Sequence, residues 1–132
     1  MAALKPEAVL ERLRRICLAL PETSEVQSWG HPNFRAGKKT FAVFEQYQGE
    51  WAICCKVPRP HQALFLKDPR FYRTPYIGHQ GWVSLRVAGR LDWEEIEELV
   101  VGSYRLVALP RMLKALVRQS PAIAGCGSPY RP

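Results

Sequence analysis

The sequence predicts an α+β fold in which an antiparallel sheet carries its helices on one face. Apolar residues recur every three or four positions near both ends of the chain and every two positions over residues 29–57. Short glycine turns join the strand segments, and such turns connect antiparallel neighbours. With 132 residues and 47% apolar side chains, the chain has the size of one domain. We expect this domain over residues 1–118 and a flexible, Pro/Gly/Ser-rich tail over 119–132.

The first element is predicted to be a helix over residues 6–20. Leu13, Cys17 and Leu20 recur at helical intervals and share one face. Pro6 suits a first helical turn, and Pro21 ends the helix because it has no N–H to donate.

A meander of three antiparallel strands is expected over residues 29–57. Gly37-Lys38 and Gln48-Gly49 are the predicted turns, because glycine reaches positive φ without a Cβ clash. The helices should cover one of two strand faces. These are the face with Phe41 and Val43 and the face with Ala42 and Phe44.

The second half of the chain continues with mixed elements. We expect a short helix over residues 60–67, a strand at 82–87, a helix over 93–108 and a last helix from Pro110. Asp92 is the predicted N-cap of the long helix, with Glu95 placed for a capping box.

Several classes of function lack their usual motifs in this sequence. No apolar run reaches the length of a membrane span, so a cytoplasmic protein is expected. CxxC pairs, HExxH helices, a G-x-S-x-G elbow and a phosphate-binding glycine loop are all missing. We therefore expect no bound metal, no cofactor and no enzymatic activity. The cysteines are expected to be free thiols, namely Cys17, Cys54, Cys55 and Cys126.

Positive charge is concentrated in the middle of the chain. The formal net charge is +7, yet residues 1–34 hold four basic and four acidic side chains, and residues 92–132 hold five of each. The surplus therefore belongs to residues 35–90. Its cations are Arg35, Lys38, Lys39, Lys56, Arg59, Lys67, Arg70, Arg73, Arg86 and Arg90, opposed by Glu45, Glu50 and Asp68.

This charge pattern is compatible with two interpretations. Phosphate-binding surfaces combine cations with amides and flat rings, and such side chains are interleaved here, among them Tyr47, Trp51, Phe71, Tyr72, Tyr76, Gln80 and Trp82. A net positive charge on a small domain also serves solubility alone, and strand tryptophans are more often core residues.

Four short stretches carry a resemblance to a known family. They are the "ALPE" helix end, the "F-x-x-GKK-x-FA" hairpin, the "GWVSL" strand and the "SYRLV" helix. In this order they resemble the MmcQ/YjbR family over about residues 8–115. The resemblance implies a CyaY-like α+β fold and DNA binding through two wings. The first wing would be the hairpin of Arg35 to Lys39, and the second the approach from Arg70 to Gln80.

Together these observations predict weak, mostly sequence-independent DNA binding by a protein taken as a monomer. The candidate contact residues are Arg35, Lys38, Lys39, Lys56, Arg59, Arg70, Arg73, Gln80 and Arg86. The alternative is a non-catalytic module that binds a small ligand or a protein. A concave apolar pocket beside Tyr76 and Trp82 would favour that alternative, and a convex basic face would favour DNA.

Overall fold

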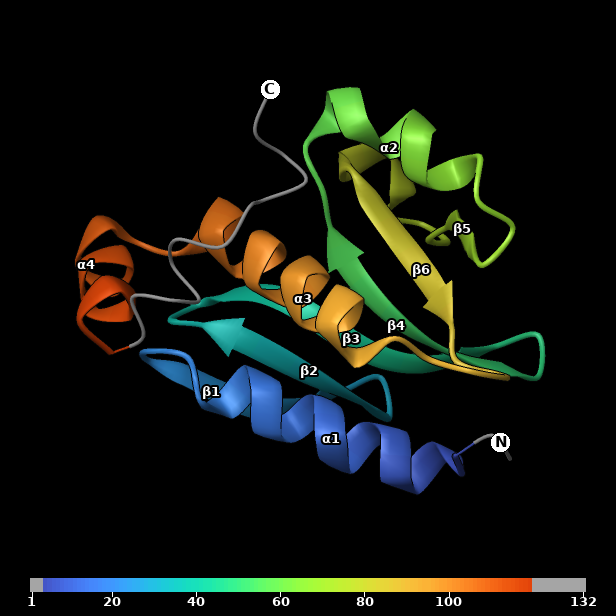
Figure 1. The fold of residues 1–132 in the computed structure, drawn as a ribbon, viewed down its shortest axis with the longest axis horizontal. Coiled ribbons are helices and arrows are strands. Elements are labelled where there is room, and N and C mark those ends of the chain that lie inside the picture. The colour runs from blue at the N-terminus through green and yellow to red at the C-terminus, as the bar shows by residue number, and fades with distance from the viewer. Residues whose placement is uncertain (1–3, 120–132) are drawn as a thin grey trace.

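The computed structural model describes residues 4–119 as a six-stranded antiparallel sheet with its helices on one face (Figure 1). The helices are α1 (Pro6–Leu18), α2 (Arg59–Leu66), α3 (Trp93–Val107) and α4 (Pro110–Gln119). The strands are β1 (Thr23–Ser28), β2 (His31–Ala36), β3 (Lys39–Tyr47), β4 (Glu50–Lys56), β5 (Phe71–Arg73) and β6 (Trp82–Arg86), with a short 3-10 helix η1 (Gly78–Gln80). The predicted fold class is confirmed. The expected flexible tail lies outside the described residues.

The strand order is β1-β2-β3-β4-β6-β5, and all neighbours are antiparallel. Antiparallel pairing brings alternate strand ends together. At one end of the sheet β2, β4 and β5 finish while β1, β3 and β6 begin, and Figure 1 shows α4 beside this end. This topology decides which charged residues meet.

Two strands of the sheet were not expected. β1 is a polar edge strand whose one aliphatic residue is Val26, so it shows no apolar alternation. β5 has three residues, too few to establish a period of two. The other elements agree with the expectation to within a few residues, although α1 ends at Leu18 rather than at residue 20.

The helix-covered face of the sheet holds the main core. Leu13 of α1, Leu99 of α3 and Met112 of α4 belong to one buried cluster with strand side chains. A register shift opposite Phe34 and Arg35 leaves an extra residue in β3. Of the two faces considered, the helices therefore cover the one with Ala42 and Phe44, and the shift adds Phe41 to it, while Val43 joins a second cluster.

Polar contacts hold α3 to the sheet. The buried Ser103 hydroxyl donates to the Phe41 carbonyl at 2.6 Å and accepts from the Lys56 backbone N–H at 2.9 Å. The expected cap is confirmed, because Asp92 accepts from the backbone N–H groups of Glu94 and Glu95. Ser103 thereby ties α3 to β3 and β4, and the Asp92 cap defines where the helix begins.

The face opposite the helices, called the open face below, is covered only in part. Val43, Cys54 and Trp82 form a small buried cluster there, and Ile77 packs on it from the segment between β5 and β6. Trp82 is thus a core residue. The β5–β6 segment crosses this face and leaves the rest of it accessible on the β2–β3 side.

Candidate nucleic-acid interface

Six of the nine candidate residues lie at the same end of the sheet. Lys38 and Lys39 stand at the β2–β3 turn, Lys56 ends β4, and Arg73 ends β5. Arg59 opens α2 just after β4, and Gln80 precedes β6. We call this the basic end, with its members Lys38, Lys39, Lys56, Arg59, Arg73 and Gln80 and the α4 cations Arg111, Lys114 and Arg118. Residues far apart in the sequence are therefore collected by strand pairing.

The hairpin tip at the basic end is fixed in place. Gly37 adopts φ +61°, and a Cβ there would lie 2.9 Å from the Met112 Cε of α4. The Gly37 N–H donates to the Glu22 carbonyl at 3.0 Å, while the Glu22 carboxylate pairs with Arg111 at 2.8 Å. The Arg111 guanidinium holds the pKa of Glu22 below its usual value. The exposed Lys38 thus projects from an anchored turn.

The contribution of α4 was not expected from the sequence. Residues 92–132 are neutral as a group, so Arg111, Lys114 and Arg118 gave no signal. The balancing acidic residues lie in the first half of α3, between Asp92 and Glu98, and of these Glu97 shares a hollow with Gln119 at the end of α4. Most of the charges that cancel along the chain are thus placed at different ends of α3.

A shallow hollow marks the β4–α2 part of the basic end. It has a volume of about 350 Å³ and is lined by Lys56, Arg59 and Gln80 together with apolar neighbours. The Arg59 guanidinium donates to the His79 carbonyl at 2.9 Å, which holds it against η1. The exposed Arg73 lies over Gly78, where a Cβ would fall 2.4 Å from the Arg73 Cγ. These cations are supported by the backbone around them.

The charge at the basic end is nearly of one sign. Segments 21–22, 36–39, 56–60, 73–81 and 110–119 contain eight Lys and Arg residues and one carboxylate, Glu22. Neighbouring strands are about 4.8 Å apart, so the distance from β2 to β5 along this end is about 20 Å. That span exceeds the widths of the DNA grooves, which are about 12 Å and 6 Å.

The remaining three candidates are placed differently. Arg35 is half-buried on the open face, and its Nε is buried without a hydrogen-bond partner in the described structure. Arg70 and Arg86 lie at the opposite end of the sheet, where β5 begins and β6 ends. They do not join the basic end.

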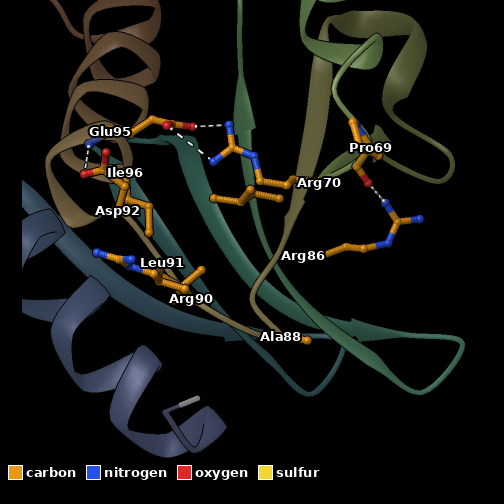
Figure 2. Close-up of a pocket in the computed structure, with 10 residues that line it drawn as sticks. Pro69, Arg70, Arg86, Ala88, Arg90, Leu91, Asp92, Glu95 and Ile96 are labelled. Carbon is orange, nitrogen blue, oxygen red and sulfur yellow. Dashed lines mark hydrogen bonds and ion pairs between the residues drawn. The ribbon is translucent and has the colours of Figure 1, made fainter. Parts of the chain in front are cut away.

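Arg70 and Arg86 are also held by partners of their own, of which Figure 2 shows Glu95 and the Pro69 carbonyl. An Arg70 nitrogen lies 2.7 Å from Asp68 and 2.9 Å from Glu95, and it holds the pKa of Asp68 below its usual value. Arg86 pairs with Glu50 at 3.3 Å and donates to the Pro69 carbonyl at 2.8 Å. Both cations therefore lie beside carboxylates, as Arg111 lies beside Glu22 at the basic end.

A larger concave site lies on the open face, beside Tyr76. Its volume is about 700 Å³, and its walls come from the β1–β2 turn, β2, the end of β3 and the β5–β6 segment. We call it the aromatic groove, lined by Ser28, Trp29, His31, Asn33, Val43, Glu45, Gln46, Tyr47, Pro75, Tyr76 and Ile77. The pocket considered in the alternative interpretation is therefore present, although Trp82 is not part of its lining.

The buried cysteines are not poised for nucleophilic chemistry. Cys17, Cys54 and Cys55 are buried free thiols, as predicted, while Cys126 lies outside the described residues. Burial raises the pKa of the Cys54 thiol to about 12, and it raises those of the other two as well. Within residues 4–119, no group of three or more His, Cys, Asp or Glu side chains is arranged to hold a metal ion. No helix in that range is long and apolar enough to cross a membrane.

Comparisons with known proteins point to one family. A family model described as YjbR matches residues 18–106, which is more than half of the chain. The crystal structure of the Deinococcus radiodurans protein DR2400, with the family domain DUF419, superposes with a TM-score of 0.69 at 20% identity. The alignment covers 92% of this chain and 95% of that one, so the likeness extends over the whole fold. No curated protein matches the sequence.

Proposed function

We propose, from the premise that the chain belongs to the YjbR family, that it binds the phosphate backbone of duplex DNA through its basic end. Family membership establishes the fold and leaves the activity open. The observation that carries the proposal is the gathering of eight cations and one carboxylate at one end of the sheet. Cations of this kind neutralise phosphates and release counterions without reading the bases.

The anchored hairpin supports this proposal. Binding at a flexible tip loses affinity to the entropy of ordering it, whereas Gly37 is already packed on α4 and bonded to Glu22. The tip and α4 present Lys38, Lys39 and Lys114 from two adjoining elements. The contact surface is thus a wing supported by a helix.

The test is the salt dependence of binding, followed by fluorescence anisotropy with a labelled duplex. If three to five phosphates are neutralised, the slope of log K against log[salt] should be about −3 to −5. The double variant Lys38→Ala/Lys39→Ala should reduce the magnitude of the slope by about 1 to 2. Lys114→Ala/Arg118→Ala should do the same if α4 shares the interface.

A matched control removes two cations from the other end of the sheet. Lys67 and Arg90 are exposed, and Lys67→Ala/Arg90→Ala changes the net charge by the same amount while the ion pairs of Arg70 stay intact. The slope of this variant should equal that of the wild type. If Lys67→Ala/Arg90→Ala reduced the slope as much as Lys38→Ala/Lys39→Ala does, the effect of charge would be diffuse. An absence of binding at low salt would contradict the proposal.

We also propose that the chain is not an enzyme. The thiols of Cys17, Cys54 and Cys55 are buried with raised pKa values, so thiolate nucleophiles are disfavoured near neutral pH. Assays with ester, phosphate and peptide substrates should show no turnover. Turnover that one substitution abolishes would contradict this proposal.

A further inference from the structure

We propose that the aromatic groove binds a methylated ammonium ion, the quaternary or trimethylated head of a small molecule or of a modified lysine side chain. None of the residues that line the groove is a member of the basic end, and the proposal does not depend on DNA binding. Its chemistry rests on three features of the groove, which are two almost fully exposed rings, one carboxylate without a hydrogen bond or ion pair, and the lack of Lys and Arg in its lining.

Two rings border the groove from distant parts of the chain. Trp29 lies in the β1–β2 turn and is 96% exposed, and Tyr76 lies between β5 and η1 and is 94% exposed. Both have left-handed backbones, with φ of 54° and 68°, a conformation that costs energy for a bulky residue. Neither ring stabilises the core, so their placement is explained by a ligand better than by folding.

The charge inside the groove is opposite to that of the protein. Glu45 is the one carboxylate in the lining, which contains no Lys or Arg. This half-buried side chain forms no hydrogen bond or ion pair within the described residues, and its electrostatic neighbour is His31. Burial raises the pKa of Glu45 because the carboxylate is partly desolvated there. A bound cation would supply the missing partner.

The kind of cation follows from the other groups in the groove. Hard metal ions take six or more oxygen ligands, whereas this lining offers a single carboxylate with amides from Asn33 and Gln46. A methylated ammonium ion is weakly hydrated and is attracted to the faces of Trp and Tyr rings. The groove volume of about 700 Å³ leaves room for the rest of a molecule behind the ammonium head.

The first test compares a cation with its neutral isostere. Choline and dimethylbutanol, its carbon isostere, have nearly the same shape, and binding of each to the full chain is followed by NMR titration. Choline should bind at least about tenfold more tightly, because only the cation gains from the rings and the carboxylate. Equal affinities would overturn the assignment, as would no binding of choline, tetramethylammonium or a trimethyllysine peptide at about millimolar concentration.

The second test separates the groups that make the site. Glu45→Gln should lower choline affinity about tenfold or more and reduce the preference over dimethylbutanol to the part that the rings supply. Glu50→Gln is the matched control, because it removes the same charge from a carboxylate outside the groove. Trp29→Leu and Tyr76→Leu should each lower affinity about fivefold or more, without changing the unfolding midpoint, since both rings are exposed. Unchanged choline affinity in Glu45→Gln would contradict the proposal.

A third comparison distinguishes the two sources of the ammonium group. A trimethyllysine peptide and the same peptide with unmodified lysine are titrated beside choline. Tighter binding of the trimethyllysine peptide than of choline would indicate a modified protein partner. The reverse order would indicate a small molecule.

Discussion

The basic end and the aromatic groove differ in nearly every property although they share one sheet. The basic end has eight cations and one carboxylate, and it is braced by α4 through Gly37 and Glu22. The groove is concave, has one carboxylate without a partner, and is bordered by exposed rings. A net charge of +7 therefore describes neither region, because antiparallel pairing places alternate strand ends, with their charged residues, at opposite ends of the sheet.

Both regions rest on the same core, and the largest effect should come from a cavity in it. Leu99 of α3 is buried in the cluster that joins the helices to the sheet. Leu99→Ala should lower the free energy of unfolding by about 2 to 5 kcal/mol, as expected for a truncated buried leucine. Urea denaturation followed by tryptophan fluorescence and by far-UV circular dichroism should give one coincident transition.

Two separate transitions would show that the basic end and the aromatic groove do not share one core, because they would then belong to units that unfold independently. A loss below about 0.5 kcal/mol would show that Leu99 is not packed as described.

Two turn glycines should differ in how much stability is lost when each is replaced by alanine, because only the turn at the basic end packs against a helix. Gly37→Ala places a methyl group against the terminal methyl of the buried Met112 and on a left-handed backbone, so we expect a loss of about 1.5 to 3 kcal/mol. Gly30→Ala, in the turn beside the groove, meets no atom within 4 Å and should cost only the backbone term of about 1 kcal/mol. Chemical denaturation measures both values.

The same pair also tests the function of the bracing. Gly37→Ala leaves the charge unchanged, yet it should weaken DNA binding by displacing the tip from α4. Similar costs for Gly30→Ala and Gly37→Ala would mean that the tip is no more constrained than the groove turn.

The smallest expected effect is the stability cost of the groove carboxylate. Because burial raises the pKa of Glu45 in the folded state, the folded protein holds a proton more readily there than the unfolded chain. Stability contributed by that proton is present in acid and is lost as the pH rises through the raised pKa. Glu45→Gln should therefore increase the unfolding temperature at neutral pH by roughly 1 to 3 °C and have no effect well below pH 4.

Neighbouring titratable groups bear on this measurement. His31 lowers the pKa of Glu45 when it is charged, while Cys54 and Tyr72 lie close enough for Glu45 to raise their pKa values. His31→Gln in the same background removes the electrostatic effect of the histidine on Glu45. A lower unfolding temperature for Glu45→Gln at neutral pH would show that the carboxylate stabilises the fold.

The sequence predicted most of the fold because each long element has a clear period. The stripe with Leu13 and Leu99 marked α1 and α3, and Asp92 marked the start of α3 correctly. β1 was missed because an edge strand of polar residues buries too little to show alternation. The extra residue in β3 depends on pairing with β2, so no local pattern could have placed Phe41.

The candidate site was predictable only as a list of residue types. Lys38 was identified from its turn, whereas its proximity to α4 depends on the contact between Gly37 and Met112. Arg70 was included among the candidates because the sequence does not reveal its ion pair with Glu95, which lies in a distant segment. Strand order and helix docking are long-range outcomes, and charge counts along the chain cannot contain them.

The strand order also sets the order in which the molecule can assemble. β1 to β4 pair with their sequence neighbours, so these contacts are local and we expect them to form early. β5 is made before β6 but has no place until β6 has paired with β4, because β6 lies between them. We therefore expect the segment that carries Tyr76 to pair late and to open readily. Its amides should exchange with deuterium sooner than those of β3 and β4. This wall of the groove, together with Arg73 and Gln80 of the basic end on the same segment, should therefore open before the β2–β3 hairpin does.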